Sequence, residues 1–420
     1  MEHSREYNLS PLVIFSFIAF VLSLLMVIPD EDWFSLLVYL AVLGVLARIL
    51  YKKSLQPIDP TFPSSLFWLA FILKLSGSAI RYWAGVDLYG GYADAVRYQR
   101  DGEYFAGFFR QFDFSVFDAI PQGTEGMSYL TGLLYTILPP SLPGSYFFFA
   151  TLAFTGSVFY YRAFLVAYPQ LKPTLFRFVI FFLPSVLFWP SSLGKDAWIF
   201  FHSGFIAYGL AQYIRQARLS GLLLAGIALF FIGVIRPPVA AMITLAVVIA
   251  YLVQGMRTAK QFVGGVLLVG FGIFIYQFST EYLLRVKGLP EVSWSGLQEF
   301  YAYQQRQTHS GGSRFAPVVL LTLLGPLYAV VTVLFRPFVW EAKNPQILVT
   351  ALESMLWLGL FWYHRRTFLT RIRLVTKDPW IAFLAVYSIL MIFSLTTIAN
   401  FGLLARQRLM FLPFLWMLFA

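Results

Sequence analysis

The sequence contains no cysteine and few charged residues, and both absences narrow the class of protein. Without cysteine the chain forms no disulfide, offers no thiol nucleophile and holds no iron–sulfur or cysteine-based zinc site. Charged residues make up only 12% of its 420 residues, against about 25% in water-soluble domains. The 4 histidines are scattered without ligand spacing, which disfavours a histidine zinc site. We therefore expect neither a metal nor a cofactor.

Long apolar runs dominate the chain and predict an all-α, polytopic transmembrane helical bundle. Hydrophobic residues make up 59% of the sequence, and several runs reach about 17–20 residues, the length that crosses a bilayer as a helix. The run at 11–29 lacks a basic n-region and a small-residue cleavage site, so we expect a retained span rather than a signal peptide. We predict a single integral membrane domain over 1–420 with about twelve spans, near 11–29, 33–50, 64–82, 145–163, 175–191, 197–213, 219–235, 238–254, 261–279, 347–363, 380–398 and 408–420.

Two further apolar segments, 127–139 and 316–335, contain residues that interrupt a membrane helix. The first is short and ends at Pro139-Pro140, and the second contains Gly325-Pro326. A proline inside a helix removes a backbone hydrogen bond and collides with the preceding turn. Non-spanning backbone at membrane depth persists only where protein or a cavity surrounds it. We therefore predict two re-entrant or broken segments, at least one of which lines a cavity.

The distribution of lysine and arginine predicts which loops lie on which side of the membrane. If these two segments do not cross, the ordinary basic loops, such as HRRTFLTRIR at 364–373, all lie on the cytoplasmic side, as the positive-inside rule requires. The net charge of +11 then reflects anchoring to anionic lipid headgroups. No basic patch resembles a nucleic-acid-binding module. We expect the protein in the bacterial cytoplasmic membrane, with membrane lipid as a partner. We expect no nucleic-acid partner.

The two longest loops, 83–126 and 280–315, lie on the predicted outer face, and each has its own pattern. In the first, charged residues share one helical face and phenylalanines follow, which predicts an amphipathic helix lying in the interface. Those residues are Asp94, Arg97, Asp101, Phe105, Phe108 and Phe109. The second loop is polar and ends in Gly311-Gly312. It is either a mobile flap over a site or a solvated connector.

Basic residues on this outer face lie in short motifs, although the positive-inside rule disfavours them there. The motifs are WPSSLGKDAW with Lys195 and Asp196, IRPPVAA with Arg236, GGSRF with Arg314, LFRPFVWEAKN with Arg336, Trp340 and Glu341, and LLARQRLMFLPF with Arg406 and Arg408. A guanidinium binds phosphate in a bidentate manner, and the N–H groups of a helix N-terminus beside Lys195 also bind anions. We predict that the motifs converge on a site for an anionic substrate.

Three of the motifs also have an ordinary structural interpretation. Lys195 and Asp196 are then an interfacial cap, and Arg236 is an arginine that snorkels at a helix end. Arg336 either forms an ion pair with Glu341, or binds phosphate while Trp340 meets a sugar ring. Glu353 lies inside a predicted span, where an ionisable residue indicates a functional site by default, but it could equally pair with Lys74 or His202.

A reaction without a metal needs a carboxylate base and cations that stabilise the leaving group. The sequence has no P-loop, HExxH, GxSxG or Rossmann fingerprint, so ATP hydrolysis and covalent serine catalysis have no support. Asp94 is the leading candidate for the base because it lies in the first outer loop. Its rivals are Asp87, Asp101, Glu125, Asp196 and Glu341.

The motif regions carry a family resemblance. Over most of 90–415 the chain resembles bacterial polytopic membrane proteins of exopolysaccharide biosynthesis, in FLPSVLFWPSSLGKDAW, IRPP, GGSRF, FRPFVWEAKN and ARQRLMFLPF. In layout it more distantly resembles C-type membrane glycosyltransferases and Wzy-type polysaccharide polymerases. The resemblance implies a polyprenyl-diphosphate-linked glycan as substrate, arginines that hold the diphosphate, inverting transfer, and partner proteins of polysaccharide assembly. The alternatives are a transporter or flippase of a lipid-linked glycan and a non-catalytic membrane subunit of a polysaccharide export complex.

Overall fold

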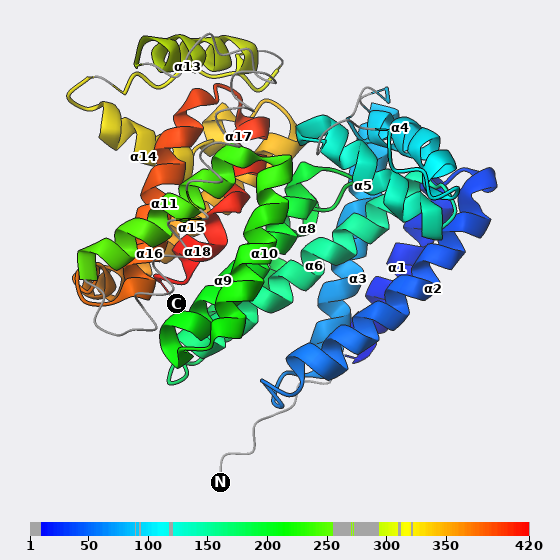
Figure 1. Ribbon diagram of the computed structural model, residues 1–420, viewed down its shortest axis with the longest axis horizontal. Helices are drawn as coiled ribbons and strands as arrows, with labels where there is room; N and C mark the ends of the chain where they lie inside the picture. Colours follow the sequence, from blue (N-terminus) through cyan, green and yellow to red (C-terminus); the bar gives the residue numbers. More distant parts are fainter. Residues whose placement is uncertain are drawn as a thin grey trace. The chain divides into compact units, whose positions relative to one another are not determined.

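The computed structural model describes residues 10–88, 90–91, 94–116, 121–254, 270, 272, 294–309, 312–320 and 322–419. These residues form helices and no named strand, as the apolar runs predict (Figure 1). Five helical stretches among them are long and apolar enough to cross a membrane: Ser10–Val27, Asp30–Leu55, Leu142–Ala167, Pro345–Ile372 and Pro379–Thr397. The other predicted spans stay predictions, and the one at 261–279 lies outside the described residues apart from 270 and 272.

The chain divides into two compact units. The first comprises Met1–Val158 and Val186–Phe201, and the second comprises Phe159–Ser185 and His202–Ala420. Helices α6 (Leu142–Ala167) and α9 (Lys195–Gln216) contribute residues to both. Of the predicted site residues, Asp94, Lys195 and Asp196 belong to the first unit, and all the others belong to the second.

The first unit contains helices whose outer faces suit contact with lipid. Its elements include α1 (Ser10–Val27), α2 (Trp33–Ile49), α3 (Ser64–Trp83), α4 (Asp94–Phe109) and α5 (Gly123–Ile137). Large apolar side chains on α1 and α2 are exposed, with Met26 at 84% and Phe34 at 78%. In the buried interior, Lys74 of α3 donates from Nζ to the carbonyl oxygen of Val186 at 2.7 Å. The ammonium also lies over the Phe200 ring, 6.0 Å from its centre.

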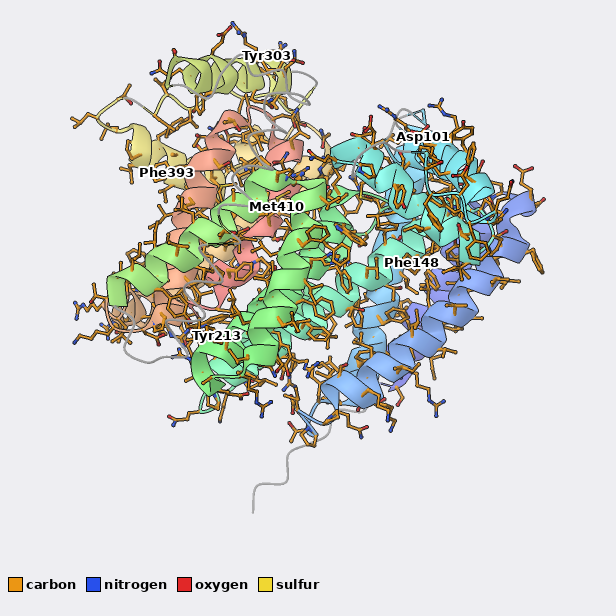
Figure 2. The ribbon with its side chains drawn as sticks, viewed as in Figure 1. Asp101, Phe148, Tyr213, Tyr303, Phe393 and Met410 are labelled. Atoms are coloured by element: carbon orange, nitrogen blue, oxygen red, sulfur yellow. The ribbon has the colours of Figure 1, made fainter. Side chains whose placement is uncertain are left out.

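The predicted amphipathic helix in the first outer loop is present as α4, which packs along α5 (Figure 1). Asp101, labelled in Figure 2, accepts a hydrogen bond from Ser128 Oγ at 3.1 Å. A Cβ at Gly102 would lie only 2.7 Å from Thr131, so this glycine permits the close packing. Helix α5 has 15 residues and is therefore about 22 Å long, too short for an apolar core of about 30 Å.

The second unit contains a group of helices around α16 (Pro379–Ser394), which packs against α11 (Pro237–Gln254), α14 (Gly325–Phe335) and α15 (Pro345–Ile372) (Figure 1). Its other elements include α7 (Thr174–Phe182), α10 (Leu219–Ile235), α13 (Trp294–Thr308), α17 (Phe401–Gln407) and α18 (Leu412–Trp416). Trp380 and Tyr387 of α16 are completely buried. In this arrangement the turn after α14, at Arg336, contacts the segment after α17, at Arg408.

Two of the predicted spans are not continuous helices. At 175–191, α7 ends at Phe182 and α8 (Pro184–Phe188) begins at Pro184, with Leu183 extended at ψ 136°. A residue before proline is driven out of the helical region. At 408–420, a 3₁₀ turn at Arg408–Met410 leads into the five-residue α18. Residues 408–419 are all buried and belong to the core of the unit.

The segment 316–335 is not a single helix either, as Gly325-Pro326 predicted, because α14 begins only at Gly325. The irregular residues before it are held by α13, the helical part of the predicted flap or connector. Tyr301 Oη and Gln305 Nε2 donate to the carbonyl oxygen of Val318 at 3.0 and 3.1 Å, and Gln305 also donates to Thr396 O at 3.1 Å. Polar side chains of α13 therefore complete the backbone hydrogen bonding of two irregular segments.

Candidate functional site

Motifs from distant parts of the sequence meet in the second unit. Arg408 Nη1 donates to the carbonyl oxygen of Arg336 at 3.1 Å. Arg236 Nη1 lies 3.5 Å from the sulfur of Met410, labelled in Figure 2, and the backbone of Arg314 pairs with that of Asn400. We call Arg236, Arg314, Arg336, Arg406 and Arg408 the arginine cluster. These contacts join four of the five motifs within this unit, and convergence of their basic side chains on an anionic substrate stays a prediction.

Arg408 anchors the end of α14. Its side chain is buried, at 1% exposure. Nη1 donates to the carbonyl oxygens of Leu334 and Arg336, at 3.5 and 3.1 Å, and Nη2 donates to Ser354 Oγ at 3.1 Å. The last carbonyls of a helix have no intrahelical partner, and a cation stabilises the negative end of the helix dipole. Arg408 thus holds the turn that carries Arg336.

Arg336 adopts the ion pair that the sequence left as one of two alternatives. Its Nε donates to both carboxylate oxygens of Glu341, at 3.0 and 3.1 Å, and its Nη1 donates to Tyr328 Oη at 2.8 Å. The guanidinium carbon also lies 4.9 Å from the ring centre of Phe315 and 5.1 Å from that of Phe401, which adds cation–π attraction. Glu341 is therefore suited to holding Arg336 and not to acting as a general base.

The Arg336–Glu341 pair is expected to stabilise the fold at neutral pH and to lose this effect in acid. Burial raises the pKa of the Glu341 carboxyl, but hydrogen bonds from Arg336 and from the Phe338 N–H, together with the charge of Arg336, bring the net pKa below its ordinary value. A lowered folded-state pKa gives stability that is present above the unfolded-state pKa and is lost as pH falls through the folded-state pKa.

Melting temperatures of the wild type and Glu341→Gln, recorded over a pH series, test this expectation. The difference should be constant near neutral pH and shrink below about pH 4.3, the ordinary pKa of glutamate. A difference that does not change on acidification would contradict the expectation.

Trp340 offers an exposed aromatic surface next to this ion pair. Its side chain is 81% exposed and stacks on Phe338, with ring centres 4.8 Å apart and planes at 19°. A flat apolar face with a polar edge can pack on a sugar ring, or it can anchor the chain at a membrane interface. Stacking of Trp340 on a sugar ring stays a prediction.

The other cluster arginines are more accessible than Arg408. Arg236 is half-buried and caps the end of α10, directly before Pro237 opens α11. Arg406 is half-buried near the end of α17, whose start is fixed because Asn400 Oδ1 accepts from the N–H groups of Gly402 and Leu403. Arg314 is exposed. Short caps and turns thus position cations that a ligand could reach.

A buried carboxylate lies beside the cluster. Glu353 of α15 is 5% exposed and accepts hydrogen bonds from the N–H of Ser185 at 2.7 Å, from Ser185 Oγ, and from Trp357 Nε1 at 3.4 Å. The charges of Glu353 and Arg408 attract each other. The sequence suggested Lys74 or His202 as its partner and missed Ser185, because the two residues are 168 positions apart.

The predicted site residues of the first unit lie at helix starts. Asp94 is the first residue of α4 and is exposed. Lys195 is the first residue of α9, and its Nζ donates to Thr124 Oγ1 of α5 at 3.0 Å. Asp196 follows it and is half-buried. Participation of these three residues in the reaction stays a prediction.

Among the described residues, no three His, Asp or Glu side chains are grouped as a metal site requires. No protein-family model matches the chain, and neither a curated protein nor a solved structure matches it. A functional conclusion therefore rests on the arginine cluster and its surroundings.

Proposed function

We propose that this chain is a membrane glycosyltransferase or polysaccharide polymerase. It uses a polyprenyl-diphosphate-linked glycan at the outer face of the bacterial cytoplasmic membrane. The observation that carries the proposal is the meeting of four arginine motifs in the second unit. A diphosphate is the group that several guanidinium groups recognise best, because each offers a planar pair of donors to phosphate oxygens.

The cluster supports this chemistry by charge stabilisation. As the acceptor hydroxyl attacks the anomeric carbon, the glycosidic bond to the diphosphate breaks and negative charge grows on the leaving group. Cations placed there stabilise the transition state more than the ground state. In this proposal Arg236, Arg314 and Arg406 contact the diphosphate, while Glu341 and Arg408 hold Arg336 in place. The hydroxyl proton passes to a carboxylate of the protein.

Turnover by arginine variants tests the proposal. A charge-assisted hydrogen bond contributes about 1.5–3 kcal/mol, and about 1.4 kcal/mol corresponds to a factor of ten in rate. We therefore expect Arg236→Ala and Arg406→Ala each to slow glycan transfer by about 10- to 100-fold. Arg→Lys should restore only part of the rate, since the planar pair of donors is lost.

The assay is glycan assembly by purified protein in liposomes, with variants matched for amount and melting temperature. Arg366→Ala is the matched control, because Arg366 is an exposed residue of α15 in the predicted cytoplasmic group. Arg371 of that group is unsuitable, since it is buried and donates to Met417 O at 2.6 Å. Wild-type turnover in both Arg236→Ala and Arg406→Ala would remove the diphosphate proposal.

One observation favours a second candidate, the non-catalytic membrane subunit of a polysaccharide export complex. Arg336 and Arg408 are held by Glu341, Ser354 and backbone carbonyls, as structural posts would be. An assay of the purified protein distinguishes the two functions. An enzyme transfers glycan without other proteins, whereas an export subunit acts only with its partner proteins.

A further inference from the structure

Arg162 is a cation in a helix that is long and apolar enough to cross a membrane. It lies on α6, five residues before the last residue, Ala167, which is about 7.5 Å along the helix. Its side chain is half-buried, and it forms no ion pair with any of the described residues. An arginine at membrane depth normally pairs with an acidic side chain or with backbone carbonyls. The counter-charge of Arg162 is therefore to be sought outside the chain.

Two aromatic rings and one hydroxyl group hold the guanidinium of Arg162 in place. Its carbon lies 4.2 Å from the ring centre of Tyr208 and 4.7 Å from that of Phe159. Nη2 donates to Tyr208 Oη at 2.8 Å, and Gln212 Nε2 donates to the same oxygen at 2.9 Å. All four residues belong to the second unit. The guanidinium is preorganised, so that a ligand immobilises little further side-chain freedom when it binds.

Most donors of this guanidinium make no hydrogen bond within the described part of the chain. Nε is buried without an acceptor there, and the bonds that the guanidinium does make come from Nη2 alone. A buried donor that stays unpaired costs free energy. A phosphate oxygen accepts from a guanidinium in a charge-assisted hydrogen bond, which is stronger than a neutral one. The group that fits Arg162 is therefore an anion with oxygen acceptors.

Aromatic rings continue from Arg162 along both helices. Phe159 precedes Arg162 by three residues on α6, and Phe205 precedes Tyr208 by three on α9, so each pair shares a helix face. The rings of Phe159 and Phe205 pack with centres 4.1 Å apart, and Phe205 is half-buried. Both rings lie on the side of Arg162 that faces away from the ends of α6 and α9, toward the middle of the apolar stretch. A ligand bound to Arg162 therefore has apolar surface beside its anionic group.

The chain is basic beyond this end of α6 and α9. Lys172 and Arg218 are exposed, while Arg215 pairs with Asp378 at 2.7 Å. The positive-inside rule places such an end on the cytoplasmic side, where basic pockets between helices bind anionic lipid headgroups. A lipid with a net negative charge suits this position better than a zwitterionic one, because basic residues repel an ammonium headgroup.

We propose that Arg162 binds the phosphate of an anionic phospholipid of the cytoplasmic leaflet, with an acyl chain lying against Phe159 and Phe205. Phosphate oxygens then accept from the guanidinium, and the aromatic rings contact the lipid at the depth where its apolar part begins. The inference does not rest on the proposed function, because Arg162 lies outside the arginine cluster and takes no part in glycan transfer.

Native mass spectrometry of the delipidated protein in detergent tests the proposal. The protein is titrated with phosphatidylglycerol and with phosphatidylethanolamine, and inorganic phosphate is added in excess as a competitor. We expect the first phosphatidylglycerol to bind at least about 10-fold more tightly than phosphatidylethanolamine, and inorganic phosphate not to displace it. Equal affinity for the two lipids would overturn the proposal. Displacement by inorganic phosphate would do so too, because the ligand would then be a free anion.

Arg162→Gln and Arg366→Gln form a matched pair, because each removes one positive charge and Arg366 is an exposed residue of α15. Arg162→Gln should weaken phosphatidylglycerol binding at least about 10-fold, since a charge-assisted hydrogen bond is lost. Arg366→Gln should bind like the wild type. Undiminished binding in Arg162→Gln contradicts the proposal, and so does an equal loss in both variants, which would show that binding follows net charge alone.

Photolabelling of the wild type provides a test that does not depend on the folding of a variant. Phosphatidylglycerol with a diazirine on its acyl chain should label peptides that contain Phe159 or Phe205. Excess unlabelled phosphatidylglycerol should suppress this labelling, and phosphatidylethanolamine should not. The proposal fails if these peptides are not labelled, or if both lipids suppress the labelling equally.

Discussion

Arg408→Ala is expected to destabilise the second unit by about 3–5 kcal/mol, as the loss of one member of a buried charged network does. The substitution leaves the carbonyl oxygens of Leu334 and Arg336 without their donor. It also leaves Glu353 without the attraction of the nearby cation. We expect a marked fall in melting temperature and little monodisperse protein after detergent extraction.

Two further proteins make this test specific. Arg406→Ala removes a half-buried arginine two residues earlier, and its melting temperature should fall much less. The double variant Arg408→Met/Glu353→Gln should recover part of the loss, because removing both charges avoids an uncompensated buried carboxylate. A wild-type melting temperature in Arg408→Ala would show that the observed contacts do not stabilise the unit.

Gly209→Leu should separate α9 from α10 and destabilise the second unit by about 1–3 kcal/mol or more, the usual range for overpacking. A Cβ at Gly209 would lie 2.4 Å from the carbonyl oxygen of Gly221, and one at Gly221 would lie 2.5 Å from that of Gly209. The two glycines therefore allow the helix backbones to touch, as small residues do at helix contacts in membranes. Thermal unfolding of the purified variant in detergent measures the effect.

Gly226→Leu on α10 is the control for this substitution. A Cβ there meets no heavy atom within 4 Å, and leucine also favours a helix more than glycine does. Its melting temperature should equal or exceed that of the wild type. If the two variants melt alike, the close approach of Gly209 and Gly221 does not hold the helices together.

The length of the apolar runs predicted most of the helices, because helix formation over such a run is a local property of the sequence. The regions that became α1, α2, α3, α10, α11, α15 and α16 were all predicted as spans. The differences from continuous helices lie at Pro184 and near Pro413, where the apolar run continues but the helix is broken or short. Both prolines are present in the sequence, but the high hydropathy of each run still predicted a continuous span. Burial of 408–419 among other helices could not be predicted, because it depends on long-range packing.

The sequence identified the arginines of the site more readily than their partners. Arginine on the predicted outer face is unexpected in a membrane protein, so each motif stood out by itself. The partners are ordinary residues such as Tyr328, Ser354 and Phe401, which no local pattern distinguishes. The ion pair with Glu341 was among the alternatives because the two residues lie five apart on one turn. An apolar pocket lined by residues of α7, α14, α15 and the segment 412–419 has no sequence signal, since its walls come from four separate segments.

The contacts of α13 have a consequence for how the chain is synthesised. Gln305 precedes by 91 residues the Thr396 carbonyl to which it donates, so the donor leaves the ribosome long before its acceptor. Irregular backbone in an apolar environment is costly when its polar groups are unpaired, and Gln305 supplies a donor for the Thr396 carbonyl. Gln305→Leu would raise the hydropathy of the chain and is nevertheless expected to impair its membrane insertion. Hydropathy alone predicts the opposite, an improved insertion.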